Sequence, residues 1–387
     1  MWHNGADLNS LGSAAQGGIP VVQRKSGHVT LHDVAHACGF SVSTVSIVLS
    51  EAPLSQNVAA STRAQIRETA RQLGYHPDAY ARSLRRRRSQ TIGVLAYDLS
   101  DPFCTPIVEG IQAGLQPADY LPLLMDAQTK RKLFDEYLRK SLERRAEGVI
   151  VIASWVFEET NLLADIEKNH VPIVILGRDL TGRKIDSLLV DNNIGGALAM
   201  QHLIDLGHRK IALIQGPEEM FDSAPRLAGM QAAAEKAGIR FDPALVFQLK
   251  SMVDPTSGFE GGRRFVSQML ASGHPFTAVV AFDDLTALGV IRGLAEAGLS
   301  VPQDCSVVGF DDVLPARVAT PGITTVHQPL KQMGLEAAQW VLRAIDQRTQ
   351  DGGSTVLLHT ARPELVVRGS TARPAAVRKR KSTTHTS

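Results

Sequence analysis

The stretch VTLHDVAHACGFSVSTVSIVLS, residues 29–50, carries the pattern of two short helices joined by a tight turn. Thr30 and Asp33 have the spacing of an N-terminal capping box, and Ser41 is placed to cap a second helix. Gly39 predicts the end of the first helix, because a C-terminal cap often needs the left-handed conformation. Apolar residues recur at helical spacing: Leu31, Val34, Ala35, Cys38, Val45, Val48 and Leu49. We therefore predict a helix-turn-helix here.

The second of these helices has hydroxyl side chains near its N-terminus. They are Ser41, Ser43, Thr44 and Ser46. Hydroxyls and the positive end of a helix dipole suit contact with phosphate groups, so the pattern favours DNA binding. An ordinary helical hairpin with small polar residues is the alternative.

The charge distribution supports a polyanionic partner for the head. The net charge is only +2, but residues 1–90 hold ten Lys/Arg against five Asp/Glu. Residues 372–387 hold five basic and no acidic residues, whereas residues 91–371 hold 26 basic and 34 acidic residues. A basic head on an acidic body predicts that the head binds nucleic acid and the body does not.

After Thr91 the sequence changes to strand-like runs separated by amphipathic segments, which is typical of parallel sheets with crossover helices. The runs are TIGVLAYD, YLPLLMDA, GVIVIAS, VPIVILGRD, SLLVDN, KIALIQG, LVFQLKS, TAVVAFDD and CSVVGFDD. They are too many for one comfortable sheet, so we predict two α/β lobes. No glycine-rich phosphate-binding motif follows a strand, and we expect no cofactor.

Ligands of open parallel sheets bind beyond the carboxyl ends of the strands. Carboxylates, an arginine and aromatic rings follow the predicted strands and suit a sugar or another polyol. These residues are Asp98, Phe103, Trp155, Arg178, Asp191, Asp283 and Asp311. For any single one, a loop cap or an ion pair is the alternative. Of the pairs Asp283–Asp284 and Asp311–Asp312, only one member each can face a cleft, because neighbours along a strand point to opposite sides.

Several classes of protein are not expected. No apolar run is long enough to cross a membrane, and the first residues lack the pattern of a secretory signal. Three scattered cysteines indicate neither a disulfide framework nor a metal site, so we expect a cytoplasmic protein. Its predicted DNA binding implies association with the bacterial nucleoid. No GxSxG nucleophile motif is present, and we expect no enzyme.

Taken together, these motifs resemble the lactose-repressor/galactose-repressor family. The head resembles it through VTLHDVA, GFSVSTVS, LGYHP and AYARSL, and the body through DLSDPF, VDNNIGG, GHRKIALI, RLAGM, AFDDLTALG, VPQDCSVVGFDD and PGITTVHQP. The resemblance implies an all-α helix-turn-helix head followed by an α/β, two-lobed, periplasmic-binding-protein-like domain with two parallel sheets. The expected segments are a disordered tail (1–27), the head (28–76), a hinge helix and linker (77–90), the two-lobed effector-binding and dimerisation domain (91–371) and a disordered basic tail (372–387).

The resemblance also assigns DNA-contacting residues. It places the second helix in the major groove, with Val42, Ser43 and Ile47 at base-reading positions. It makes 77–84 a hinge helix that folds on operator DNA, with Ala81 and Leu84 in the minor groove. Thr30 and Tyr75, in matching motifs, complete the expected DNA-contacting set with Ser41, Thr44 and Ser46. Ile47 departs from the family pattern, since isoleucine can only touch a thymine methyl group.

For the body, the resemblance implies effector contacts from Asp98, Phe103, Arg226 and Asp311, and Asp222 lies close to them in sequence. It predicts a first lobe of about 91–188 and 326–347 and a second of about 189–325 and 353–370. The implied protein is a transcriptional repressor that binds a near-palindromic operator as a homodimer, under control of a carbohydrate-like effector. The alternatives are a transporter's solute-binding protein and a sugar-active enzyme.

Overall fold

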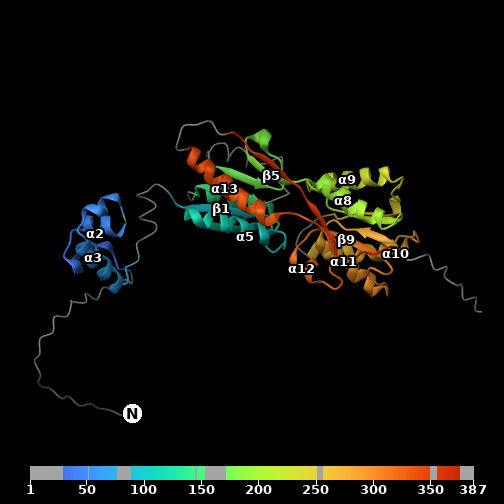
Figure 1. Ribbon diagram of the computed structural model, residues 1–387, viewed down its shortest axis with the longest axis horizontal. Helices are drawn as coiled ribbons and strands as arrows, with labels where there is room; N and C mark the ends of the chain where they lie inside the picture. Colours follow the sequence, from blue (N-terminus) through green and yellow to red (C-terminus); the bar gives the residue numbers. More distant parts are fainter. Residues whose placement is uncertain are drawn as a thin grey trace, which may run out of the picture. The chain divides into compact units, whose positions relative to one another are not determined.

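The computed structural model describes residues 29–50, 52–75, 89–143, 146–152, 171–250, 256–348 and 355–374. The chain divides into two compact units, residues 1–88 and 89–387 (Figure 1). The predicted hinge residues Ala81 and Leu84, and Trp155, lie outside the described residues.

The first unit is a small helical head whose start and stop signals are those that the sequence predicts. Its helices are α1 (Leu31–Cys38), α2 (Val42–Leu49), the 3-10 turn η1 (Pro53–Asn57) and α3 (Ala60–Gln72). Thr30 and Asp33 form the capping box, and Gly39 ends α1 with a φ of 72°. A shared core holds the helices together: Val34, Ala35, Cys38, Val45, Val48, Ile66 and Ala70 are buried.

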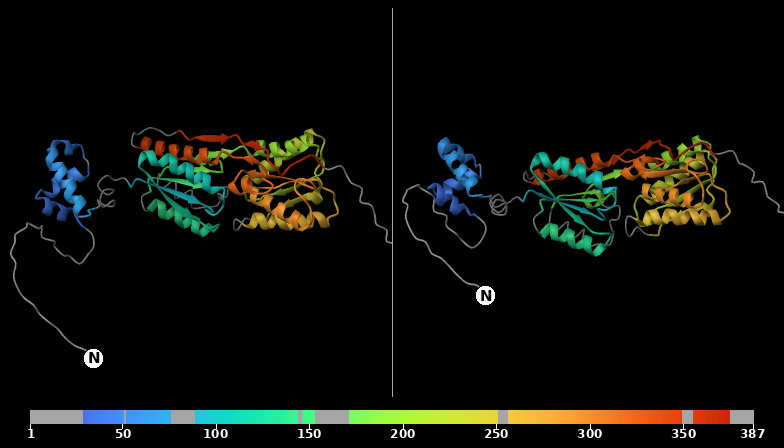
Figure 2. Two further views of the ribbon diagram at one scale, coloured as in Figure 1. Left: turned by 60° about the horizontal axis from the view of Figure 1, so that its bottom comes forward. Right: turned by 90° about the horizontal axis from the view of Figure 1, so that it is seen from below.

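The second unit contains two six-stranded sheets, each covered by helices on both faces (Figure 2). The first sheet has the order β11-β5-β4-β3-β1-β2, and its strands are β1 (Thr91–Ala96), β2 (Leu121–Asp126), β3 (Gly148–Ile152), β4 (Ile173–Leu176), β5 (Asp186–Val190) and β11 (Leu358–Ala361). Helices α5 (Cys104–Leu115) and α13 (Leu330–Arg348) pack on one face, and α6 (Arg131–Glu143) packs on the other.

The second sheet has the order β12-β10-β9-β8-β6-β7. Its strands are β6 (Ile211–Gln215), β7 (Val246–Gln248), β8 (Ala278–Val280), β9 (Ser306–Asp311), β10 (Thr324–His327) and β12 (Glu364–Val366). Helices α8 (Asn192–Asp205) and α9 (Ser223–Lys236) cover one face. Helices α10 (Thr256–Ala271) and α11 (Asp284–Glu296) cover the other, and the short α12 (Leu314–Val318) follows β9. Among the described strands only β12 pairs in antiparallel fashion, and the prediction of two essentially parallel sheets is confirmed.

The predicted lobe boundaries need correction. Strand β10 pairs with β9, so the second lobe extends to His327, not to 325. Strand β11 pairs with β5, so residues 358–361 belong to the first lobe, where the sequence predicted the second. The reason is that β5 would otherwise leave an open edge of backbone groups, and the returning chain satisfies them.

The C-terminal boundary at 371 is also too early. The Ser306 hydroxyl donates to the Ala372 carbonyl, and the Ala372 amide donates back to that hydroxyl. The His208 Nε2 lies 2.8 Å from the same carbonyl. Three residues of the predicted tail, 372–374, are therefore part of the described body.

Candidate functional site

The N-terminus of α2 is organised by a side-chain cap. The Ser41 hydroxyl accepts the backbone amide of Thr44 at 3.1 Å and lies 2.8 Å from the Thr44 hydroxyl. These two hydroxyls hold each other in place at the positive end of the helix. Thr30 is engaged in the same manner at α1, where its hydroxyl donates to Asp33 at 2.7 Å.

The remaining predicted DNA contacts divide by exposure. Ser43 is exposed, and Ser46 and Ile47 are half-buried on α2. Val42 and Tyr75 pack against the core of the head, so part of each side chain serves the fold. Of these residues Ser43 is the exposed one, and Ile47 does not pack against the core of the head.

In the second unit, Arg226 is the centre of a buried cluster. Its guanidinium is 4% exposed and donates to the Asn192 side chain at 2.8 Å and to the Phe282 carbonyl at 2.7 Å. It also lies 3.7 Å from the ring centre of Phe310. A Cβ atom at Gly196 would lie 2.0 Å from the Arg226 carbonyl, so this glycine lets α8 approach α9 closely enough to place the arginine.

Two predicted effector residues flank this guanidinium. Arg226 Nη2 lies 3.4 Å from Asp222 Oδ2 and 3.7 Å from Asp311 Oδ1. Burial raises the pKa of Asp311 well above its ordinary value, although Arg226 opposes that shift. Asp311 also has a φ of 107°, a conformation that non-glycine residues seldom adopt and that is often associated with functional sites.

The first lobe contributes its residues from the loop after β1. Asp98 Oδ1 accepts the amide and the hydroxyl of Ser100, and the Phe103 amide donates to Asp101 Oδ1 at 2.9 Å. Burial raises the pKa of Asp101 to about 6, with Asp283 and Asp98 adding to the effect. Asp101 in turn contributes to the raised pKa of Asp311. Asp101 of the first lobe and the second-lobe carboxyls Asp283 and Asp311 therefore interact electrostatically: Asp283 raises the pKa of Asp101, and Asp101 raises that of Asp311.

Other candidates at the strand ends cap helices or bond to neighbouring loops. Asp191 caps α8 through the Ile194 amide, and Asp283 caps α11 through the Thr286 amide. Asp284 turns away from Asp283 and accepts the Thr325 hydroxyl and the Val313 amide. These are the loop caps that the sequence left open as an alternative.

The Arg178 guanidinium lies 6.0 Å from the ring centre of Phe221, the residue before Asp222. It follows β4 in the first lobe, and Phe221 precedes α9 in the second.

Sequence reasoning missed Asn192, Gln328 and Asp101. The Gln328 side chain donates to Asp311 Oδ1 at 2.5 Å. It follows β10, a strand that the sequence pattern did not predict, and the end of that strand would have been the signal. Asp101 lies within the quoted motif DLSDPF, for which the resemblance implied only Asp98 and Phe103 as effector contacts.

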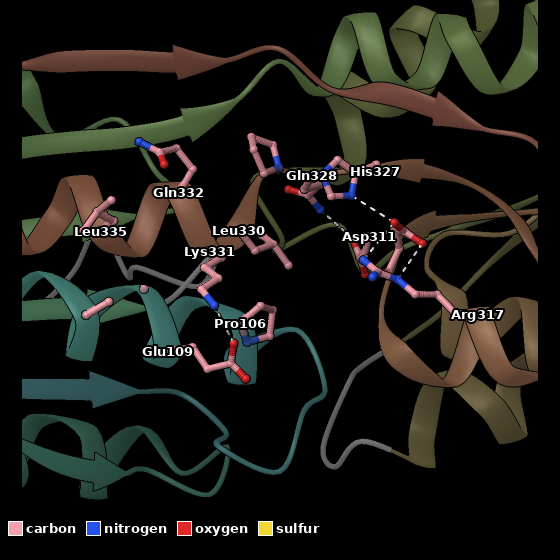
Figure 3. Close-up of a pocket in the computed structure, with 14 residues that line it drawn as sticks. Pro106, Glu109, Asp311, Arg317, His327, Gln328, Leu330, Lys331, Gln332 and Leu335 are labelled. Atoms are coloured by element: carbon pink, nitrogen blue, oxygen red, sulfur yellow. Dashed lines mark hydrogen bonds and ion pairs between the residues drawn. The ribbon is translucent and has the colours of Figure 1, made fainter.

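A cavity of about 540 Å³ lies beside Asp311, between α5 and α13 of the first lobe and α12 of the second (Figure 3). Its lining residues are Pro106, Glu109, Gly110, Ala113, Asp311, Asp312, Arg317, His327, Gln328, Pro329, Leu330, Lys331, Gln332 and Leu335. Volumes of this size are typical of small-molecule sites.

Within the described residues, no group of His, Cys, Asp and Glu is arranged to hold a metal ion. The three cysteines are buried and free. A search of the same residues for a helix long and apolar enough to cross a membrane finds none.

Known proteins resemble both units. Residues 30–78 match the model of bacterial regulatory proteins of the lacI family, and residues 200–371 match that of a periplasmic binding protein-like domain. The chain is 33% identical over 345 residues to the HTH-type transcriptional repressor PurR of Edwardsiella ictaluri, covering 89% of this chain and 97% of the relative.

Two solved structures with similar folds have bound ligands. The lac repressor dimer bound to operator and the anti-inducer ONPF has a TM-score of 0.75 and 27% identity, covering 89% of this chain and 99% of that one. The complex of the transcriptional regulator CelR with cellobiose has a TM-score of 0.65 and 28% identity, covering 89% and 100%.

Proposed function

Because this chain belongs to the lacI family of bacterial regulatory proteins, we propose that it represses transcription from a near-palindromic operator under control of a carbohydrate-like effector. It is a DNA-binding transcriptional regulator with an effector-binding domain, as its relatives are. These relatives are regulators and not enzymes, in agreement with the expectation from the sequence. The lacI-type head also argues against a transporter's solute-binding protein.

In this proposal α2 is the recognition helix. Its capped N-terminus suits a phosphate contact, while Ser43 and Ile47 reach base edges in the major groove. Residues 77–84 form the hinge in this proposal, with Ala81 and Leu84 in the minor groove. Ile47 makes the half-site favour a base pair that presents a thymine methyl group at its position. Since its proposed partner is operator DNA, we propose that the protein acts in the cytoplasm in association with the nucleoid.

The proposed effector contacts are Asp98, Phe103, Asp222 and Asp311, with Arg226 holding the last two in position. Carboxylates accept hydrogen bonds, so they favour a ligand rich in hydroxyl donors. The effector therefore belongs to the sugars or related polyols, in line with the cellobiose in the CelR complex. The observation that carries this proposal is the buried Arg226–Asp222–Asp311 cluster at the carboxyl end of β9, where Asp101 of the other lobe contributes to the raised pKa of Asp311.

A homodimer is proposed from exposed apolar residues. Strand β2 is an edge of the first sheet, and its Leu121, Leu123 and Leu124 are 72%, 45% and 46% exposed. On α12, Leu314 and Val318 are 69% and 71% exposed. An open apolar edge strand invites pairing unless something covers it, and a second copy of the chain would do so.

A gel-shift titration with DNA upstream of the protein's own gene tests the regulatory function. We expect salt-sensitive binding with a dissociation constant on the order of 10⁻⁸ M, and a shift in that constant when a sugar that stabilises the protein is added. Equal affinity for random DNA at physiological salt contradicts the proposal.

A further inference from the structure

The chain enters the first lobe at Gln90, directly before β1, and there one carboxylate binds the incoming backbone. Glu147 Oε1 accepts the Gln90 amide at 2.7 Å, and Glu147 Oε2 accepts the Tyr120 hydroxyl at 2.7 Å. Gln90, Tyr120 and Glu147 are the residues immediately before β1, β2 and β3, which are neighbours in the sheet. The Glu147 side chain therefore ties together the N-terminal ends of three adjacent strands.

Gln90 is held in a conformation that needs support from its surroundings. Its φ is 50°, in the left-handed region that non-glycine residues seldom adopt unless neighbouring contacts fix them there. Its carbonyl accepts the Leu121 amide at 2.9 Å, and its side-chain amide donates to Asp119 Oδ2 at 3.4 Å. With the bond to Glu147, the amide, the carbonyl and the side chain of Gln90 are all bonded to the first lobe. These contacts fix the direction in which the chain leaves the lobe towards the head.

The pairing of the three strands does not depend on the Glu147 side chain. Strand β1 pairs with β2 and with β3 along their lengths through backbone bonds. The Glu147 amide itself donates to the Thr91 carbonyl at 3.0 Å, which joins β3 to β1 without the carboxylate. What the side chain adds is a charge-assisted bond to the residue ahead of the sheet, and such bonds are stronger than those between neutral groups. Its contribution is therefore to the entry of the linker.

The linker is short enough for its attachment point to matter. Leu84, the proposed minor-groove residue, precedes Gln90 by six positions. Six steps of an extended chain span at most roughly 22 Å. When two binding modules are joined, the effective concentration of the second at its site depends on the length and stiffness of the tether. Releasing Gln90 from the lobe lengthens and loosens a tether of this size.

From these contacts we propose that Glu147 is a positioning residue for operator binding. By holding Gln90 and Tyr120 it fixes where the linker leaves the body, so that the second head of a dimer reaches its half-site with little further ordering of the chain. Glu147 does this without contacting DNA or effector. The inference rests on the proposed homodimer and its near-palindromic operator, and it extends that proposal to a residue of the first lobe.

The test compares a full palindrome with a single half-site, both taken from sequences that the wild-type chain selects from a random pool. Fluorescence anisotropy with labelled duplexes measures the two affinities for the full-length protein. Glu147→Ala should weaken binding to the full palindrome by roughly ten-fold, the factor by which ordering the backbone of one residue lowers an affinity. Binding to the half-site should be unchanged, because one head occupies it without the second.

Three further variants separate the hydrogen bonds of Glu147 from its charge. Glu147→Gln keeps an oxygen that can accept the Gln90 amide and an amide group that can donate to the Tyr120 oxygen, so it should bind the palindrome nearly as tightly as the wild type. Tyr120→Phe removes one of the two bonds and should have a smaller effect than Glu147→Ala in the same direction. The matched control is Glu143→Ala, at an exposed glutamate that ends α6; it should change neither affinity.

Three results overturn the inference, and they can be told apart. If Glu147→Ala lowers the affinity for palindrome and half-site equally, or lowers neither, Glu147 does not position the linker, although the proposed function stands. If Glu147→Gln loses as much affinity as Glu147→Ala, the charge acts and not the bonds to Gln90 and Tyr120. If the wild type binds the palindrome no tighter than the half-site, the proposed binding by two heads is itself wrong, and the role of Glu147 with it.

Discussion

Replacing Arg226 by methionine tests the central cluster of the proposed effector site. The substitution keeps an unbranched side chain but removes the bonds to Asn192 and to the Phe282 carbonyl, and it leaves Asp222 and Asp311 without their cation. Breaking a buried ion pair by removing one partner costs about 3–5 kcal/mol, because the remaining charge stays buried. We expect the free energy of unfolding to fall by about that amount near neutral pH.

The decrease in the free energy of unfolding caused by Arg226→Met should grow as the pH rises. Without Arg226 the folded-state pKa of Asp311 rises further above its unfolded value, so protonation of this carboxyl stabilises the folded variant. The stability of the variant is therefore retained at low pH and is lost as the pH rises through the raised pKa. The deficit should be larger at about pH 8 than at about pH 5.5.

Urea unfolding followed by far-ultraviolet circular dichroism at the two pH values measures this deficit. Arg263→Met in the same lobe is the matched control, because Arg263 pairs with Glu260 and Glu296 on the surface. Exposed ion pairs contribute little to stability, so Arg263→Met should change the free energy of unfolding very little. A deficit for Arg226→Met that is no larger than that of the control, or that does not change with pH, would refute the view of Arg226 as the neutraliser of a buried carboxylate pair.

Three further predictions concern other parts of the molecule. Ile47→Arg should change which base is preferred at one position of each half-site, as read by selection of bound sequences from a random pool, while a uniform change across sequences would contradict a base-reading role. Leu123→Glu on β2 should shift sedimentation from dimer to monomer, whereas the same change at exposed Leu270 of α10 should not. Asp101→Asn keeps an oxygen for the Phe103 amide but removes a carboxyl whose pKa is raised to about 6. Since a raised carboxyl pKa means stability lost as pH rises from about 4 to 6, this variant should gain thermal stability above about pH 6 and little near pH 4.

The helical head follows from its sequence almost residue by residue. Its signals are local, because Thr30, Gly39 and Ser41 act on backbone groups within four positions of themselves. The nine strand-like runs of the body were likewise readable from their apolar content. The late strands β10, β11 and β12 were not, since they lack a long apolar run and are defined by the strands with which they pair.

The site could be predicted as a list of residues but not as a set of bonds. Family resemblance implied Asp98, Phe103, Arg226 and Asp311, with Asp222 close in sequence. Nothing local in the sequence shows that Arg226 is already bonded to Asn192 and to the Phe282 carbonyl. Those contacts join residues 34 and 56 positions apart. The same holds for Asp191 and Asp283, whose role as helix caps depends on where the next helix begins.

The two aspartates that end β9 show how the effector site can be coupled to the connections between the lobes. Asp311 and Asp312 both have positive φ, 107° and 59°, and their side chains diverge. Asp311 lies near Arg226, whereas Asp312 is bonded to His327 at the end of β10, to Arg317 of α12 and to Arg368 beyond β12.

Because the two residues share one peptide bond in a strained conformation, Asp311 cannot move far without moving Asp312. A ligand that binds Asp311 therefore acts on the bond between Asp312 and His327, which lies where the chain passes from β10 to α13 of the first lobe. Allosteric control requires that the effector make different contacts in two arrangements of the lobes. A contact to Asp311 meets this requirement if the bonds of Asp312 differ between those arrangements.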